Sequence, residues 1–328
     1  MKIVVADANL APLRAHLEEG FPTGAEVSWP DPRDVDAVAA AVADADVLVA
    51  GRCPAAVGAS GRNLKLVHAA GAGVDGIDVP ALPPGTVVAN TFHHEDSIAE
   101  YVVAATILLR RGFLIQDTAL RRDEWASPAH DPALPWGNSL GAATIGFVGF
   151  GHIGARTWER FRAFGARGVA VTRRGDVDAA ARGLEWAGST DDLGTLLDRA
   201  DVVVVSAPLT PETTGMIGPA ELERMKCGAI LVNVGRGPLV EEKAVFEALR
   251  NGDIAGAALD VWYSYPASGN HGAPSELPFR ELPNVLMTPH SSGLTRQTFL
   301  GRAEDIAANV RRLAAGERLV NVVAVAGE

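Results

Sequence analysis

The sequence predicts an α/β protein that contains a doubly wound parallel sheet and a second, smaller sheet. Short apolar runs of strand length alternate with helical stretches along the chain, a pattern typical of parallel sheets. The chain also has 328 residues, which is more than a single hydrophobic core usually holds. We therefore expect two domains, each built on its own sheet.

The expected strands form an early and a late group. The early group contains KIVVA near the start and the segments 46–50, 65–70 and 86–90. The late group contains TIGFVGF, GVAVT and the segments 201–208, 229–235, 256–262 and 284–290. Between the groups, Ser97–Arg111 has an acid near its start, arginines at its end and no internal Gly or Pro, which predicts a long helix. The Pro- and Trp-containing stretch Gln116–Gly141 predicts an irregular arm.

Composition and charge narrow the class of protein. With 48% hydrophobic and 21% charged residues, the chain is typical of a globular rather than a disordered protein. Cys53 and Cys227 lie far apart without metal-ligand spacing, which indicates a reducing cytosol and no zinc site. Val102–Leu109, the longest uncharged apolar stretch, is far shorter than the roughly 20 residues that cross a bilayer. The net charge of −11 disfavours nucleic acid and anionic membranes. We expect a cytoplasmic protein.

A glycine fingerprint follows the strand-like segment TIGFV. Gly149, Gly151 and Gly154 open a helical stretch, which is the context that a dinucleotide site requires. The first glycine permits a tight turn, the second lets a diphosphate approach the backbone, and the third lets helix and strand pack closely. The diphosphate then lies at the helix N-terminus, beside His152 and Ile153. A glycine turn without a ligand is the alternative interpretation.

The strand after this helix, GVAVT, ends where NAD-dependent enzymes place a carboxylate for the adenosine ribose. Thr172, Arg173 and Arg174 stand there instead, and Asp176 is too far along to replace the missing acid. Arginine forms charge-assisted bonds to a 2′-phosphate, which a carboxylate would repel. NADP(H) is therefore favoured as the cofactor. NAD(H) stays possible if both arginines are ordinary solvent-exposed residues.

Five sequence blocks occur together in a recognisable order: GFGHIG, ADVVVVSAPLTPETTGMIG, MKCGAILVNVGRGPLVEE, GAALDVW and NVLMTPHSSG. The chain thereby resembles the D-isomer-specific 2-hydroxyacid dehydrogenases. The resemblance implies a Rossmann cofactor domain, residues 98–290, inserted into a smaller flavodoxin-like α/β substrate domain, residues 1–97 and 291–328. It also implies hydride transfer between the cofactor and a small 2-oxo or 2-hydroxy acid, and a homodimer that pairs through the cofactor domain.

Reduction of a 2-oxo acid needs a cation for the substrate anion and an acid that protonates the carbonyl oxygen. Arg236 follows the strand AILVNVG at the edge where α/β sheets bind ligands, and its planar fork suits a carboxylate. His290 ends NVLMTPH, and imidazole titrates near neutral pH. In the resembling family these two positions do this work. A purely structural hydrogen bond is the alternative for His290.

The chain departs from the family at one catalytic position. The family places a glutamate five residues after the aspartate of its ALDV block, where it pairs with the histidine. This chain keeps Asp260 but has Tyr265 in place of the glutamate. The related formate dehydrogenases also lack it, so a formate-like or other unusual anion oxidoreductase is an alternative. Corepressors of the same superfamily make a cofactor-responsive binding protein a second alternative, which the retained Arg236 and His290 disfavour.

The resemblance assigns further binding residues. The loop GAGVDGID is similar to the family loop whose backbone amides cradle a substrate carboxylate, here Ala72, Gly73 and Val74. By the same carry-over, Asp260 should lie near the nicotinamide carboxamide and Pro208 near the adenine.

A histidine pair and an aromatic cluster are less specific signals. His94 is a candidate substrate-binding or proton-transfer residue, whereas His93 is expected to be a loop residue. The segment HEDSI lacks the second histidine of HExxH, so we expect no metal site. Trp262 and Tyr263, next to Tyr265, fit equally well a packed interface or a wall that restricts substrate size.

Overall fold

The computed structural model describes residues 1–266 and 269–327, and the chain divides into two compact units. Unit 1 comprises Met1–His94 and Leu294–Glu328, and unit 2 comprises Glu95–Gly293. The sequence resemblance predicts the two domain boundaries at 97/98 and 290/291. The first lies earlier because the long helix already begins with the acids Glu95 and Asp96, whose charges suit a helix N-terminus. The second lies later because Ser291 and Ser292 are hydrogen-bonded within unit 2.

Unit 1 is a six-stranded sheet covered by helices on both faces. Its strands are β1 (Lys2–Ala6), β2 (Glu26–Ser28), β3 (Val47–Ala50), β4 (Leu66–His68), β5 (Val87–Ala89) and β13 (Val322–Val325). Its α-helices are α1 (Arg14–Glu19), α2 (Val35–Val42), α3 (Ala55–Ser60) and α11 (Arg296–Ala315). The strand order is β13-β5-β4-β3-β1-β2, parallel throughout except that β13 runs antiparallel to β5.

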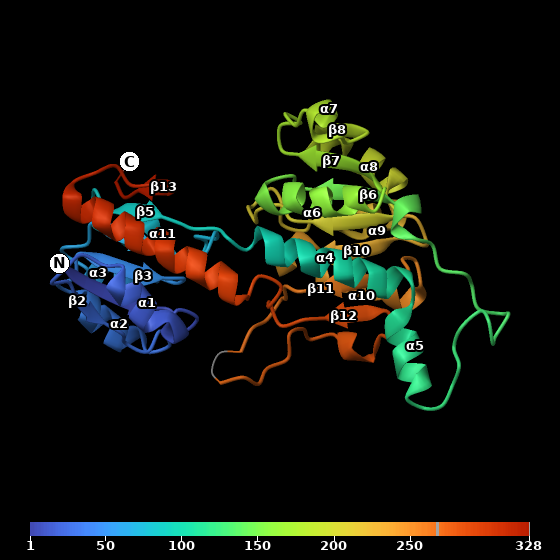
Figure 1. The fold of residues 1–328 in the computed structure, drawn as a ribbon, viewed down its shortest axis with the longest axis horizontal. Helices are drawn as coiled ribbons and strands as arrows, with labels where there is room; N and C mark the ends of the chain where they lie inside the picture. Colours follow the sequence, from blue (N-terminus) through green and yellow to red (C-terminus); the bar gives the residue numbers. More distant parts are fainter. Residues whose placement is uncertain (267–268, 328) are drawn as a thin grey trace. The chain divides into compact units, whose positions relative to one another are not determined.

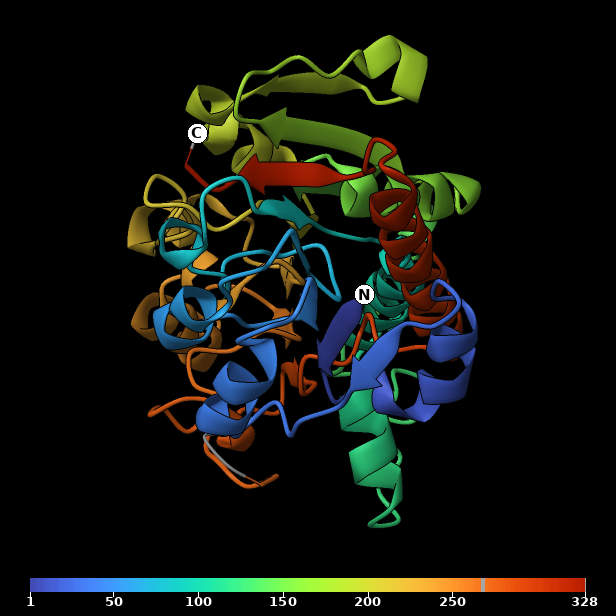
Figure 2. The ribbon, with the colours of Figure 1, turned by 90° about the vertical axis from the view of Figure 1, so that its left-hand side faces the viewer.

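Helices cover the two faces of this sheet in pairs, as Figure 2 shows. One face packs on α2 and α3 through Val38, Val42 and Val57, and the other packs on α1 and α11 through Leu17 and Ile306. Strands buried on both faces read as continuous apolar runs, which explains why β1, β3, β4 and β5 were evident in the sequence.

Unit 2 contains a seven-stranded parallel sheet (Figure 1). Its strands are β6 (Thr144–Val148), β7 (Arg167–Thr172), β8 (Trp186–Ser189), β9 (Val202–Val205), β10 (Ile230–Asn233), β11 (Gly256–Leu259) and β12 (Val285–Met287). Its α-helices are α4 (Glu95–Arg110), α5 (Phe113–Leu120), α6 (His152–Ala163), α7 (Ala179–Arg182), α8 (Leu193–Arg199), α9 (Pro219–Arg224) and α10 (Glu242–Asn251).

The strand order of this sheet is β12-β11-β10-β9-β6-β7-β8. Strands β7 and β8 follow β6 on one side and β9 to β12 follow on the other side, so the order of the parallel strands reverses between β6 and β9. Helices α4 and α6 pack on one face, where Val102 and Phe161 are buried, and α8 and α10 pack on the other, with Leu197 and Phe246. The fold class predicted from the sequence is confirmed. In such sheets ligands bind at the carboxyl ends of the strands, at the point of reversal.

The sequence missed three strands and part of one helix. Strands β2 and β8 lie at sheet edges, are only partly buried and lack a strong apolar run. Strand β13 is an apolar run, VVAV, but it is short and half exposed at the edge of its sheet. The arm expected at Gln116–Gly141 is wrong in its first residues, because Gln116 already lies inside α5. Beyond this helix, Trp125 is 63% exposed and Trp136 is 82% exposed.

Within residues 1–266 and 269–327, no helix has both the length and the apolar character needed to cross a membrane. Over the same residues, no group of three or more His, Cys, Asp or Glu side chains is arranged to hold a metal ion.

Candidate active site

The glycine fingerprint forms the turn between β6 and α6, at the reversal of the sheet. Gly149 has φ +89°, and a Cβ there would lie 2.7 Å from the backbone nitrogen of Ala207 at the end of β9. A Cβ on Gly154 would lie 2.8 Å from the carbonyl oxygen of Gly149. Close packing therefore explains both of these glycines.

Gly151 differs from the other two glycines. A Cβ at this position would meet no atom within 4 Å, so packing does not require a glycine here. Gly151 is the N-cap of α6 and offers no side chain to the first N–H groups of the helix. Open space beside uncapped helix N–H groups is what a diphosphate needs. These residues fit the dinucleotide that the fingerprint implies.

At the end of β7 the three candidate residues have different surroundings. The Thr172 hydroxyl accepts a hydrogen bond of 3.1 Å from the backbone N–H of Gly175. The Arg174 guanidinium pairs with Asp176 at 3.0 Å, whereas Arg173 is exposed. Hydrogen bonds from Thr210 and from the Glu212 backbone lower the pKa of the exposed Glu212 carboxyl, and the positive charge of Arg173 adds to this effect.

Arg236 lies in a braced turn directly after β10. The buried Asn233 side chain accepts a hydrogen bond from the Gly235 N–H at 3.1 Å and donates one to the Arg236 carbonyl at 3.0 Å. A Cβ on Gly237 would lie 2.3 Å from the Trp262 carbonyl oxygen, so the turn packs tightly against the neighbouring strand end. The backbone of Arg236 is thereby fixed at the carboxyl edge of the sheet.

His290 lies two strands further along the same edge, in the turn that follows β12. Its φ of +56° is in the left-handed region, which is unfavourable for a residue with a Cβ. Its N–H donates to the Thr288 carbonyl at 3.0 Å. A strained backbone at this position needs support from its surroundings.

The fully buried Asp260 supplies that support. One carboxylate oxygen accepts from the Thr288 hydroxyl at 2.6 Å and the Ser291 N–H at 2.9 Å. The other accepts from the Ser292 N–H at 3.1 Å and its hydroxyl at 2.5 Å. Donors on both sides of His290 thus converge on one carboxylate. This role was not evident from the sequence, which indicated only a contact with nicotinamide.

The Thr288 hydroxyl also lies 2.9 Å from the Tyr101 hydroxyl on α4. Because Thr288 has one proton and a carboxylate can only accept, Thr288 donates to Asp260 and Tyr101 donates to Thr288. Burial raises the pKa of Tyr101 to about 12, so its phenol keeps the proton that this donation needs.

Tyr265 touches His290 directly. Its hydroxyl lies 3.2 Å from Nδ1 of His290 and accepts a hydrogen bond of 3.2 Å from the Trp262 N–H. The phenol therefore lies beside the imidazole, which is where the resemblance to the family leads us to expect a carboxylate. Unlike a carboxylate, a hydroxyl can donate to a neutral imidazole or accept from an imidazolium.

The other two aromatic residues of the cluster pack inside unit 2. Trp262 is 5% exposed, and its indole donates to the Thr288 carbonyl at 2.8 Å. The Tyr263 hydroxyl donates to the Val240 carbonyl at 2.9 Å. Packing thus accounts for Trp262 and Tyr263, while Tyr265 is 51% exposed.

In unit 1, the predicted anion loop follows β4. The Asn90 side chain donates to the Ala72 carbonyl at 2.8 Å, and the Thr91 N–H donates to the Gly71 carbonyl at 3.2 Å. These bonds fix the loop that contains Ala72, Gly73 and Val74 against the segment that leaves β5. His94, at the end of that segment, is buried, and its ring stacks on Phe92 with centroids 6.4 Å apart.

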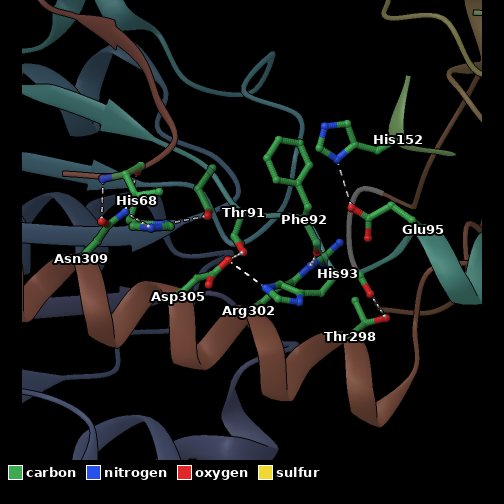
Figure 3. A network of polar contacts seen from close by, with 12 residues as sticks. His68, Thr91, Phe92, His93, Glu95, His152, Thr298, Arg302, Asp305 and Asn309 are labelled. Atoms are coloured by element: carbon green, nitrogen blue, oxygen red, sulfur yellow. Dashed lines mark hydrogen bonds and ion pairs between the residues drawn. The ribbon is translucent and has the colours of Figure 1, made fainter. Parts of the chain in front are cut away.

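The residues before His94 are docked on α11, as Figure 3 shows. Nε2 of His93 and the Thr91 hydroxyl both bind Asp305, at 2.9 and 2.7 Å. The Thr298 hydroxyl donates to the His93 carbonyl at 3.1 Å. His93 is therefore a structural residue of unit 1, and no local sequence pattern indicates its distant partner Asp305.

Comparison with known proteins identifies the family. Residues 103–292 match the family model described as the NAD binding domain of D-isomer specific 2-hydroxyacid dehydrogenases. The chain is 36% identical to D-3-phosphoglycerate dehydrogenase from Mycobacterium tuberculosis over 92% of its length, but it spans only 55% of that relative. It is 33% identical to glyoxylate reductase from Thermofilum pendens, over 92% of this chain and 85% of the relative.

A solved structure covers both units. The NADPH-dependent glyoxylate/hydroxypyruvate reductase from Sinorhizobium meliloti, in complex with NADP and malonate, is 26% identical with a TM-score of 0.79. The match covers 98% of this chain and 96% of that one. The resemblance predicted from the sequence motifs is confirmed, and the chain belongs to the D-isomer specific 2-hydroxyacid dehydrogenase family.

Proposed function

We propose that this chain is an NADP(H)-dependent oxidoreductase that interconverts a small 2-oxo acid and the corresponding 2-hydroxy acid. The observation that carries the proposal is the contact between His290 and Tyr265. Asp260 anchors the turn that contains His290, and this turn lies on the same sheet edge as Arg236. An imidazole and a guanidinium at one ligand-binding edge are what carbonyl reduction requires. Membership of the family supports the same reaction class.

Each residue has a distinct role in the proposed reduction. A bound nicotinamide would supply the hydride for the carbonyl carbon. Arg236 holds the substrate anion with its planar fork. His290 donates a proton from Nε2 to the carbonyl oxygen, because Nδ1 faces Tyr265. The backbone amides of Ala72, Gly73 and Val74 offer a further site for the carboxylate.

Tyr265 allows His290 to change its protonation state. When the imidazole is charged, Nδ1–H donates to the phenol oxygen; when it is neutral, the phenol can donate to Nδ1. The Trp262 N–H holds the phenol in place in both states. The contact between Nδ1 and the phenol can therefore persist in both protonation states of His290.

We propose NADP(H) as the preferred cofactor, with Arg173 as the main ligand of the 2′-phosphate. Arg174 already pairs with Asp176, so its engagement would require that ion pair to be exchanged. The Thr172 hydroxyl already accepts a hydrogen bond from the Gly175 N–H.

Calorimetry tests this cofactor preference. A charge-assisted bond contributes about 1.5–3 kcal/mol, so NADPH should bind at least about tenfold more tightly than NADH. Arg173→Ala should remove most of that preference, and Arg174→Ala less. Tighter NADH binding by the unmodified protein would contradict the assignment.

The remaining cofactor contacts are proposals that rest on the fingerprint. His152, Ile153 and the three fingerprint glycines would surround the diphosphate, and Pro208 would lie near the adenine. The Asp260 carboxylate already accepts four hydrogen bonds from its own chain. The carboxamide of the nicotinamide would therefore have to be an additional donor to the same carboxylate.

The substrate screen should contain both 2-oxo acids and formate, since Tyr265 replaces the family glutamate. Absorbance of the reduced nicotinamide reports turnover in either direction. Reduction of glyoxylate or another small 2-oxo acid supports the proposal. Oxidation of formate without reduction of any 2-oxo acid would favour the alternative, an unusual anion oxidoreductase.

We further propose a cytoplasmic homodimer. Trp125 and Trp136 expose large apolar surfaces beyond α5, which a protein surface rarely leaves uncovered. The free thiols of Cys53 and Cys227 suit a reducing compartment. Sedimentation at micromolar concentration should show a dimer, and Trp136→Ser with Trp125→Ser should weaken it.

A further inference from the structure

The loop after β4 contains three successive backbone N–H groups that make no internal hydrogen bond. Within residues 1–266 and 269–327, no acceptor lies within hydrogen-bond distance of the N–H groups of Ala72, Gly73 and Val74. Gly73 is exposed, and Ala72 and Val74 are partly exposed, so a ligand can reach the loop. Successive backbone N–H groups without internal acceptors are suited to an anion. They therefore fit the carboxylate of the proposed substrate.

Two carbonyl groups of the same loop are held by the segment that follows β5. The Thr91 N–H donates to the Gly71 carbonyl at 3.2 Å. The Asn90 side-chain amide donates to the Ala72 carbonyl at 2.8 Å. In a trans peptide unit the N–H and the C=O point in opposite directions, and the described chain has no cis peptide bond. The bond from Asn90 to the Ala72 carbonyl therefore turns the Gly73 N–H away from this segment.

The segment that holds the loop is itself well anchored. Asn90 is 6% exposed, and its N–H donates to the Asn321 carbonyl, just before β13, at 3.0 Å. The next side chain, Thr91, donates to Asp305 on α11 at 2.7 Å, as Figure 3 shows. The Asn90 amide thus has a fixed base from which to orient the loop.

Packing alone does not explain an asparagine at this position. Within the described residues, the buried Oδ1 of Asn90 has no hydrogen-bond partner. An unpaired buried acceptor costs free energy, and an apolar side chain of similar size would avoid that cost. The side chain's hydrogen bond to the Ala72 carbonyl is therefore the interaction that accounts for the amide.

We infer that Asn90 is a positioning residue for substrate binding, which holds the Ala72 carbonyl so that the Gly73 N–H stays available to the substrate carboxylate. The inference rests on the proposed function and adds to it a residue that acts through the loop and does not itself contact the substrate. His290 and the proposed cofactor residues belong to unit 2. Loss of the Asn90 amide should therefore weaken binding of the carboxylate without weakening binding of the cofactor.

Calorimetry with oxamate, an unreactive analogue of a 2-oxo acid, tests the inference in the NADPH-loaded protein. Asn90→Ala should weaken oxamate binding about tenfold, which corresponds to the loss of one charge-assisted hydrogen bond from the loop. The affinity for NADPH should not change. In steady-state assays the same variant should raise KM for glyoxylate by a similar factor and leave kcat within about twofold, the pattern of a lost ground-state binding interaction.

Two further variants separate positioning from a general loss of stability. Asn309→Ala is the matched control, because Asn309 is 2% exposed, lies in the same unit and donates to the Val320 carbonyl at 2.9 Å instead of to the loop. It should lower stability and leave the affinity for oxamate unchanged. Asn90→Leu keeps the volume of the side chain and removes the donor, so it should weaken oxamate binding as much as Asn90→Ala does.

The outcomes distinguish this inference from the proposed function. Unchanged oxamate affinity in the two Asn90 variants, an equal loss in Asn309→Ala, or a matching loss of NADPH affinity would each overturn the inference. If the unmodified protein neither bound oxamate nor reduced any 2-oxo acid, the proposed function would fail as well. Normal oxamate binding and turnover in the unmodified protein, with unaffected Asn90 variants, would overturn this inference alone.

Discussion

Two histidines in this molecule share an unusual backbone conformation but have different partners. His93, in unit 1, has φ +67°, and His290, in unit 2, has φ +56°. The His93 ring binds the carboxylate of Asp305 at 2.9 Å, whereas the His290 ring binds the phenol of Tyr265 at 3.2 Å. The first arrangement suits a permanent structural bond. The second suits a histidine that gains and loses a proton.

The two turns also differ in what holds the backbone. Asp305 binds the His93 side chain itself and is partly exposed. Asp260 is buried and binds the residues on either side of His290, leaving the imidazole to Tyr265. In unit 2, therefore, separate residues support the backbone and the imidazole. This separation is expected where a side chain must react while its backbone stays fixed.

The largest expected difference between the two histidines is in activity. Asparagine tolerates a positive φ, so His290→Asn and His93→Asn both keep the turn while removing the imidazole. Loss of a general acid should lower kcat/KM for reduction of a 2-oxo acid by about 10²–10⁴-fold in His290→Asn. His93→Asn should stay within about twofold of the unmodified protein, because His93 only docks the segment on α11. Steady-state rates of NADPH oxidation compare them; similar losses in the two variants would remove the distinction.

The second difference is in stability. Asp260→Asn replaces an oxygen that accepts two hydrogen bonds with an amide that cannot accept, inside the protein. It should lower the free energy of unfolding by about 3 kcal/mol, whereas Asp305→Asn, at a partly exposed site, should cost about 1 kcal/mol. Urea unfolding measures both. Equal costs would mean that the buried carboxylate is not the main support of the His290 turn.

A third histidine, His68, extends the comparison to a ring that is fully buried. Nδ1 of His68 donates to the Ala69 carbonyl at 2.9 Å, and Nε2 accepts from the Asn309 amide at 3.0 Å (Figure 3). Burial lowers the pKa of His68 below its usual 6.5. The native state then binds fewer protons than the unfolded chain, so this contribution to stability is complete above pH 6.5 and is lost as the pH falls.

As the pH falls below 6.5, we expect the free energy of unfolding to decrease by roughly 1 kcal/mol per pH unit. His68→Gln should flatten this part of the profile, since glutamine does not titrate there. Urea unfolding at a series of pH values gives the slope for each protein. An unchanged slope in His68→Gln would assign the acid sensitivity to other groups.

The sequence predicted those parts of the site that lie on local motifs. The fingerprint glycines, Arg236 and His290 follow apolar strands, and strand ends in an α/β sheet are where ligands bind. The replacement of the family glutamate by Tyr265 was also visible, because the position is defined relative to Asp260. These features need only short-range sequence patterns and a known strand order.

The contacts that complete the site could not be predicted in the same way. Thr91 and Asp305 are 214 residues apart, and Asn90 and Ala72 are 18 apart, and no local pattern links either pair. The edge strand β13 has an apolar sequence, VVAV, but nothing in that short run shows that it pairs antiparallel with the distant β5. Such features depend on how distant elements pack, which one sequence without relatives does not specify.

The central claim is that His290 is the proton donor and that Tyr265, a neutral partner, sets the pH range in which it works. The direct test is the pH profile of kcat/KM for reduction, in the unmodified protein and in Tyr265→Glu, with Tyr265→Phe as the control that removes the hydroxyl without adding charge. A carboxylate beside Nδ1 favours the imidazolium, so the basic limb should move upward by about one to two pH units in Tyr265→Glu and not move upward in Tyr265→Phe. If the limb stays in place although a structure of Tyr265→Glu shows the new carboxylate bonded to His290, that histidine is not the titrating proton donor, and His94 becomes the next candidate.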